Sequence, residues 1–189
     1  MRFATVVSRV FEPSIVLGVI LVLAGVRSGL TIVQTLLWGL VFVAPPTILR
    51  WWAAGKRGLD WDIHDRKRRI VPLVILFVFI LADMLLLRLF SVFTLADLFF
   101  LFLVWTLGFL VITTCVTKIS GHTSCVALAT GLIVSWFGWG WWPILLIVPL
   151  VAWSRVVRRD HTVPQVIMGA LYSWVLLVVF DYWIITSFL

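Results

Sequence analysis

Residues 154–169 read SRVVRRDHTVPQVIMG, a basic stretch between two strongly apolar segments of the chain. Its first half contains three arginines followed by one histidine: Arg155, Arg158, Arg159 and His161. Guanidinium groups bind phosphate oxygens in bidentate fashion, and an imidazole can attack an electrophile or transfer a proton near neutral pH. The stretch therefore indicates an anion site at a membrane surface. The alternative is a positive loop that only holds the membrane topology.

A second polar stretch, residues 118–123 (KISGHT), has the same character at another membrane edge. It places Lys118, a small Ser-Gly turn and a second histidine, His122, within six positions. A helix that begins here would add backbone N–H donors for an anion. We therefore expect the two stretches to form one site.

The composition is that of an integral membrane protein. Of 189 residues, 63% are hydrophobic and only 12% are charged, whereas a soluble domain carries about 25% charged residues. The apolar runs repeatedly reach the roughly 20 residues that cross hydrocarbon, and only helices satisfy the backbone groups of such runs. We expect an all-α, polytopic transmembrane helical bundle with about six to seven membrane helices. It should form one membrane-embedded domain over residues 1–189.

The apolar runs predict where these helices lie. The expected helices cover residues 14–26, 30–49, 70–89, 95–116, 125–137, 144–153 and 163 to the C-terminus. Pro45 and Pro46 should kink or end the second helix, because proline lacks a donor and clashes with the preceding turn. If each hairpin crosses fully, residues 50–69, 118–123 and 154–161 all open on the same face.

The charges suggest an orientation and a class of partner. The net charge of +7 lies in short loops between apolar segments, which favours topology and phosphate binding over nucleic-acid binding. All of the fifteen Lys and Arg residues except Arg27 and Arg88 fall toward one face. By the positive-inside rule that face is cytoplasmic, in the cell membrane, although phosphate binding would require some of these cations in either orientation. The expected partners are the lipid bilayer and a lipid phosphate, and the oligomeric state stays open.

Three short motifs stand out in combination: Arg66, Arg69 and Pro72; then Ser120, Gly121 and His122; then Ser154, Arg155 and His161, with Gly169 beyond. Together they resemble the type 2 phosphatidic acid phosphatase superfamily. The resemblance covers about residues 56 to 170, and its second and third parts are specific in combination. Members of that family share a helical core with vanadium haloperoxidases. They remove phosphate from lipid phosphates, isoprenyl diphosphates or sugar phosphates without a metal or another cofactor.

The resemblance assigns a role to each matched residue. It implies that His161 is the nucleophile, which forms a phosphohistidine, and that His122 is the general acid. The implied phosphate ligands are Arg155, Arg69, a basic neighbour that is Lys67 or Arg66, the Ser120 hydroxyl and the Gly121 N–H. Such cations and dipoles suit a phosphoryl group because its transition state spreads charge over three oxygens. No metal ligand is implied.

The chain departs from the family pattern at three positions. Asp62 stands where the first motif usually has lysine, and Ile119 stands where the second usually has proline. Gln165 replaces the aspartate four residues after the nucleophile, a spacing that puts it on the same helical face as His161. Its carbonyl can accept the imidazole N–H, but an amide stabilises an imidazolium less well than a carboxylate. Either a weaker orienting group suffices, or Asp160 contributes, or activity is low.

These observations favour one function and leave two alternatives. The leading interpretation is a metal-independent phosphoric monoester or diphosphate hydrolase of the membrane, acting on a lipid phosphate or isoprenyl diphosphate. One alternative is a catalytically silent relative that binds or transports lipid. The other is a lipid phosphotransferase, in which an alcohol replaces water. The sequence leaves open which lipid is used and whether it carries one phosphate or two.

Overall fold

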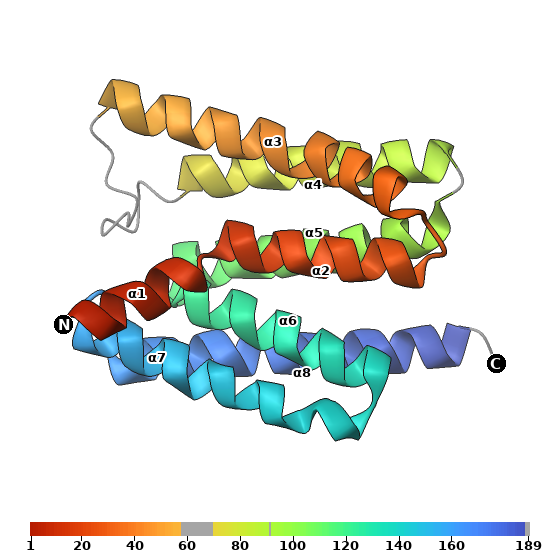
Figure 1. Cartoon of the computed structure of the whole chain (residues 1–189). Coiled ribbons are helices and arrows are strands. Elements are labelled where there is room, and N and C mark those ends of the chain that lie inside the picture. Colours follow the sequence, from red (N-terminus) through yellow and green to blue (C-terminus); the bar gives the residue numbers. More distant parts are fainter. Residues whose placement is uncertain (58–69, 91, 188–189) are drawn as a thin grey trace. The chain divides into compact units, whose positions relative to one another are not determined.

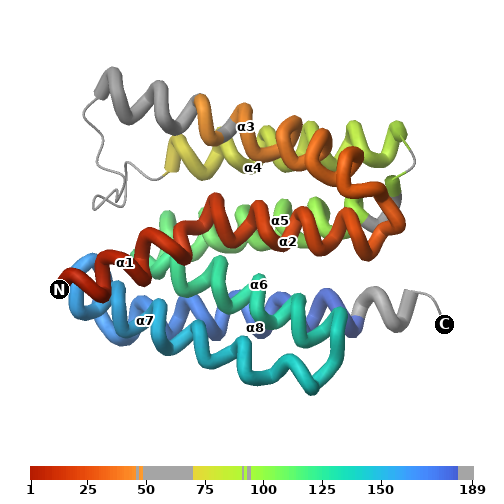
Figure 2. Tube along the Cα trace, in the orientation of Figure 1, coloured from red at the N-terminus to blue at the C-terminus, as the bar shows by residue number. Residues whose placement is uncertain are grey.

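The computed structural model describes residues 1–57, 70–90 and 92–187, and this part of the chain is all-helical, with no strand (Figure 1). The expected all-α class is confirmed. Figure 2 traces the same helices along the Cα path. The elements are α1 (Arg2–Val10), α2 (Pro13–Arg27), α3 (Ile32–Arg57), α4 (Ile70–Leu89), α5 (Phe93–Val111), the π-helix η2 (Ile112–Val116), α6 (Gly121–Phe137), the 3-10 helix η3 (Trp139–Leu146), α7 (Ile147–Val157) and α8 (Val163–Ser187).

Five stretches of the described residues are long and apolar enough to cross a membrane. They are Arg2–Arg27, Ile70–Leu89, Leu95–Val116, Trp139–Val157 and Val163–Tyr182. Two shorter apolar helices cover Ile32–Pro45 and Gly121–Phe137. The chain is thus a helical membrane protein, while the expected six to seven crossings stay a prediction.

The chain divides into two compact units. The first comprises Met1–Leu17 and Lys118–Leu189, and the second comprises Gly18–Thr117. The second motif (Ser120, Gly121 and His122) and the third motif (Ser154, Arg155 and His161) both lie in the first unit, so their geometry is described within one body. That residues 1–189 form a single domain stays a prediction.

The first unit is built around α6, which packs against α8 and α7. Nearly all of α6 from Thr123 to Ile133 is buried. At its middle the Trp174 indole donates a hydrogen bond to the Ala127 carbonyl, at 3.1 Å. Polar pairs such as this hold helices in register, because each polar group inside the bundle needs a partner. The apolar core consists of Val7, Val126, Ala127, Val148, Val151 and Ala170.

The sequence predicts its first helix at residues 14–26, but the structure has an additional helix before it, α1. It packs against α7 in the first unit, with Val7 in the core and the ring of Phe3 6.0 Å from that of Trp153. Nine residues with two arginines are too short and too polar to suggest a membrane helix. Its packing brings the polar face that carries Ser8 to the end of α7.

In the second unit, the expectation that Pro45 and Pro46 could end the helix is wrong. Helix α3 continues through Pro45 and Pro46 to Arg57, so the proline pair does not end the helix. Two missing N–H donors remove only two bonds of a long helical ladder, and apolar membrane helices tolerate that loss. Helices α4 and α5 pack side by side in this unit, and their connection is held by a 2.6 Å ion pair between Arg88 and Asp97.

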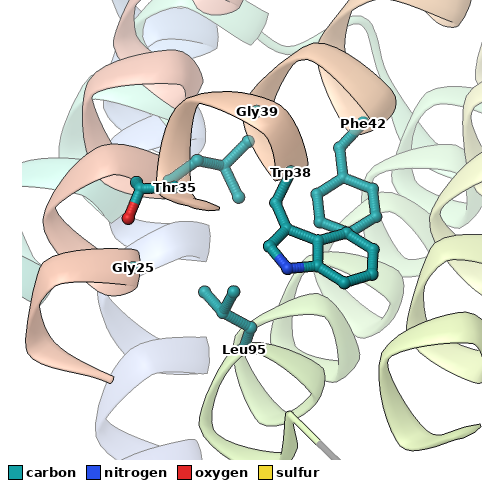
Figure 3. Close-up of a pocket in the computed structure, with 7 residues that line it drawn as sticks. Gly25, Thr35, Trp38, Gly39, Phe42 and Leu95 are labelled. Atoms are coloured by element: carbon teal, nitrogen blue, oxygen red, sulfur yellow. The ribbon is translucent and has the colours of Figure 1, made fainter. Parts of the chain in front are cut away.

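A small apolar pocket lies between the helices of the second unit (Figure 3). A Cβ atom on Gly25 would stand 2.5 Å from Cγ2 of Thr35, so the glycine is what permits this approach of α2 and α3. Trp38 stacks on Phe42 with a centroid distance of 5.3 Å, and Phe99 packs against Phe42 in a tilted arrangement at 4.6 Å. None of the residues that line the pocket belongs to the phosphatase motifs: Leu21, Gly25, Thr35, Trp38, Gly39, Phe42 and Leu95.

Candidate active site

Helix α6 begins at Gly121, four residues before the expected start at position 125. Ser120 is its N-cap: the Ser120 hydroxyl accepts hydrogen bonds from the Thr123 N–H, at 3.3 Å, and from the Thr123 hydroxyl, at 3.1 Å. Such a cap supplies an acceptor for one of the backbone N–H groups that have no partner within the first turn of a helix. The SGH motif is therefore a helix N-terminus, with Gly121 and His122 in its first turn, where the helix dipole favours an anion.

Ser120 is fully buried at this cap, with none of its surface exposed. Its observed contacts are structural, and its predicted contact with phosphate stays a prediction. Gly121 and His122 are both partly exposed.

Helix α7 ends in a left-handed turn that the sequence did not reveal. The Arg159 N–H donates to the Val156 carbonyl, at 2.9 Å, and the Asp160 N–H donates to the Arg155 carbonyl, at 3.1 Å. These are the two bonds of a Schellman motif, and Arg159 takes the left-handed position with φ of 61°. Glycine usually occupies that position, because a side chain there costs roughly 1–2 kcal/mol. The turn carries Asp160 back toward the last turn of α7.

Arg155 is buried, with only 1% of its surface exposed. Its Nη1 donates to the Ser8 hydroxyl at 2.6 Å and lies 3.2 Å from Oδ2 of Asp160. A buried charge is strongly destabilising unless it is paired and hydrogen-bonded, and these two partners supply that compensation. Ser8 is the site residue that sequence reasoning missed. No local signal marks it, because 147 positions separate it from its partner.

Asp160 contacts cations from both motif stretches: Arg155 and Arg158 from residues 154–169, and Lys118 from residues 118–123. Its Oδ2 accepts a hydrogen bond from Nε of Arg158, at 2.8 Å, in addition to its contact with Arg155. Its backbone carbonyl accepts a hydrogen bond from Nζ of Lys118, at 3.1 Å. That Asp160 contributes in place of the aspartate of the resembled family stays a prediction, and in the structure its carboxylate contacts Arg155 and Arg158.

His161 is buried, with 6% of its surface exposed, and its Nδ1 lies 3.1 Å from Oε1 of Gln165. The Thr162 N–H donates to the same Gln165 atom at 3.2 Å. A backbone N–H can only donate, so that atom must be the amide oxygen, and Nδ1 of His161 must carry the hydrogen that it accepts. In the neutral ring the other nitrogen, Nε2, then holds the lone pair. This is the tautomer that a nucleophilic histidine requires.

Gln165 also has a structural role at the start of α8. Thr162 directly precedes the helix and Gln165 is its third residue. The glutamine side chain that reaches back to the Thr162 N–H is half of a capping box, for which T-x-x-Q is a sequence signature. One amide oxygen therefore caps α8 and orients the imidazole of His161.

The two motifs are joined directly where α6 and α8 begin. The Ser120 N–H donates to the Gln165 carbonyl at 3.2 Å. A Cβ atom on Gly169 would stand 2.9 Å from the Ser120 carbonyl oxygen and 3.5 Å from the Ser124 nitrogen, so only glycine allows this approach. The starts of α6 and α8, the end of α7 and α1 lie at one end of the first unit (Figure 1). The predicted residues His122, His161, Arg155, Gln165, Ser120 and Gly121 thus share that end.

The remaining predicted ligands are placed differently. Arg66, Lys67 and Arg69 of the first motif lie outside the described residues. Ser154 is fully buried, and its hydroxyl donates to the Val151 carbonyl of its own helix at 2.7 Å. Arg159 is exposed beside the turn. Within residues 1–57, 70–90 and 92–187, no group of three or more His, Cys, Asp or Glu side chains is arranged to hold a metal ion.

Comparison with family models, with curated proteins and with solved structures finds no match to this chain. The resemblance to the phosphatase superfamily therefore stands on the motif residues alone.

Proposed function

We propose that this membrane protein is a phosphatase that removes phosphate from a lipid phosphate or an isoprenyl diphosphate through a phosphohistidine. One observation carries the proposal. In a neutral His161 ring, the hydrogen bonds of Gln165 Oε1 place the hydrogen on Nδ1 and the lone pair on Nε2. The buried guanidinium of Arg155 belongs to the last turn of α7, six residues before this histidine. A general membrane packing role requires neither a fixed histidine tautomer nor a buried arginine.

In the first step of the proposed reaction, the lone pair on Nε2 of His161 attacks phosphorus. The bond between phosphorus and the leaving oxygen breaks, and that oxygen takes the electron pair together with a proton from His122. Arg155 and the N–H groups at the start of α6 bind the three equatorial oxygens, on which the transition-state charge is spread. The Nδ1 hydrogen of His161 stays bonded to Gln165, whose carbonyl dipole stabilises the positive ring.

In the second step, water attacks the phosphohistidine. Neutral His122 takes one proton from the water, while the P–N bond breaks and returns its electron pair to Nε2 of His161. Inorganic phosphate then leaves, and both histidines have their starting protonation states. The cycle consumes only water and the phosphate ester, so no redox partner is needed.

The substrate class follows from the location of the site. Its motifs begin or end apolar helices, as the spans Trp139–Val157 and Val163–Tyr182 illustrate. A phosphate carried on a lipid tail would be held at that depth by the bilayer itself. The motifs favour a core like that of the phosphatidic acid phosphatase and haloperoxidase family, with Arg69 and Lys67 or Arg66 completing the set of cations.

A second candidate is a silent relative that binds a lipid phosphate without cleaving it. One specific observation favours it: the partner of His161 is an amide, and an amide stabilises the imidazolium of the first step less than a carboxylate does. A phosphotransferase would use the same first step with an alcohol in place of water. The assay that follows separates all three functions.

Purified protein should release phosphate from at least one substrate among phosphatidate, phosphatidylglycerophosphate and isoprenyl diphosphates. Activity should persist in chelator and fall with vanadate, because the cations of the proposed site are side chains. Binding without phosphate release would favour the silent relative. Transfer of phosphate to an added alcohol would favour the phosphotransferase. Loss of turnover in chelator, with rescue by magnesium, would contradict metal independence.

We also propose that the site faces the cytoplasm, and Cys115 offers a reporter. Cys115 is exposed three residues before Lys118, whereas Cys125 is buried. An impermeant maleimide should leave Cys115 unlabelled in intact cells and label it after permeabilisation. Cys115→Ser is the control for specificity, and Thr117→Cys is a second reporter in that background. Labelling in intact cells would place the site outside.

A further inference from the structure

In the turn between α7 and α8, the Asp160 carboxylate contacts Arg155, to which we assign substrate phosphate, and the neighbouring Arg158. Oδ2 of Asp160 lies 2.8 Å from Nε of Arg158 and 3.2 Å from Nη1 of Arg155. The Asp160 side chain is only 9% exposed, so solvent screens these contacts weakly. A carboxylate between two guanidinium groups occupies the kind of position in which a phosphate oxygen would bind.

One nitrogen of Arg155, Nη1, is the atom at which Asp160 and a substrate phosphate would meet. Nη1 carries two hydrogens. This nitrogen contacts two oxygens of the protein, the Ser8 hydroxyl at 2.6 Å and Oδ2 of Asp160 at 3.2 Å. A phosphate oxygen that approaches Nη1 therefore meets both of these oxygens. The Ser8 hydroxyl is neutral, whereas the Asp160 carboxylate also repels the incoming phosphate.

We propose that Asp160 is a resident anion that competes with phosphate for Arg155 and Arg158. It weakens the binding of phosphate anions at this site and speeds the release of inorganic phosphate after each turnover. The inference rests on the proposed phosphatase function and adds a determinant of its affinity. The opposite role, in which Asp160 orients the two arginines for the substrate, predicts a change of opposite sign.

The backbone of the turn is anchored independently of the Asp160 carboxylate. The backbone carbonyl of Asp160 accepts a hydrogen bond from the Lys118 ammonium, and the backbone N–H of Asp160 donates to the Arg155 carbonyl. The Arg159 N–H bond to Val156 closes the same turn. Asp160→Asn changes none of these backbone bonds and nearly preserves the shape of the side chain. The variant therefore isolates the charge.

The experiment measures binding of inorganic phosphate directly, and as product inhibition, in wild type and Asp160→Asn. Removal of one negative charge within a few ångströms of the phosphate should tighten binding about tenfold or more. Asp160→Glu keeps the charge and should not tighten binding. Asp97→Asn removes the same charge from the ion pair with Arg88 in the second unit and should stay within about twofold of wild type.

Unchanged or weaker phosphate binding by an Asp160→Asn protein that keeps wild-type helicity would overturn the inference and assign Asp160 an orienting role. Asp160→Ser provides a second neutral variant if the asparagine protein does not fold, and the same tightening is expected of it. Equal tightening by Asp97→Asn would also overturn the inference, because it would show a general effect of net charge. Failure of the proposed function looks different: the wild type would then bind phosphate without hydrolysing any substrate, or would not bind it.

Discussion

We expect the replacement of His161 by alanine to abolish turnover of every substrate, and formation of the phosphoenzyme with it. The reason is that a nucleophile is needed whatever the leaving group, and no other group of the site can take its place. Loss of a nucleophile that acts with other groups as a unit typically costs roughly 10⁴-fold or more in rate. The measurement is phosphate release, together with rapid quenching to trap phosphohistidine, on the purified variant.

His64→Ala is the matched control, because His64 is the remaining histidine of the chain and lies in none of the three motifs. It should retain wild-type activity. Gln165→Asp is a companion variant: a carboxylate behind His161 should keep or raise activity if Gln165 orients that ring. A phosphoenzyme that still forms in His161→Ala would rule out this histidine as the nucleophile.

His122→Ala should have an effect that depends on the leaving group. An alkoxide is a poor leaving group that needs a proton, whereas an acidic phenol leaves without one. General-acid catalysis typically contributes on the order of 10² to 10⁴ in rate. Hydrolysis of an alkyl phosphate should fall by about that factor, while an aryl phosphate with an acidic phenol should still be hydrolysed measurably. The ratio of kcat/KM for the two substrates is the quantity to measure.

The control for this experiment is His161→Ala, which should lose both activities. If the two histidine variants lose activity equally on alkyl and aryl phosphates, the assignment of His122 as general acid is wrong. A preserved ratio with a uniformly lower rate would instead indicate that His122 only binds the phosphate.

Long apolar runs made the larger helices predictable. The expected helix at residues 70–89 coincides with α4, and the one at 95–116 corresponds to α5 together with η2. Prediction failed where the local composition is polar. The first turn of α6, GHTS, was interpreted as a loop, and α1 was not recognised as a helix. Hydrophobic periodicity carries no information about a helix start that is stabilised by a serine cap.

The candidate site divides in the same way. The motifs SGH and SRVVRRDH were visible in the sequence, and so were their histidines, Arg155 and the i, i+4 relation of His161 to Gln165. The sequence has a capping-box signature at Thr162 and Gln165. Only the structure shows that the Thr162 N–H bonds to Oε1 of Gln165 and thereby orients the amide. The left-handed turn at Arg159 could not be predicted from the sequence, because no glycine occupies that position.

The sequence by itself determined that this is a helical membrane protein and which polar residues interrupt its apolar runs. These properties depend on composition and on spacing within single segments, because the bilayer requires apolar length and internal hydrogen bonds from each helix separately. The tertiary structure alone decided which oxygens meet Arg155. Ser8 reaches it from α1, and Asp160 reaches it through the turn that closes α7. Contacts between distant segments depend on how helices pack, and no local pattern encodes them.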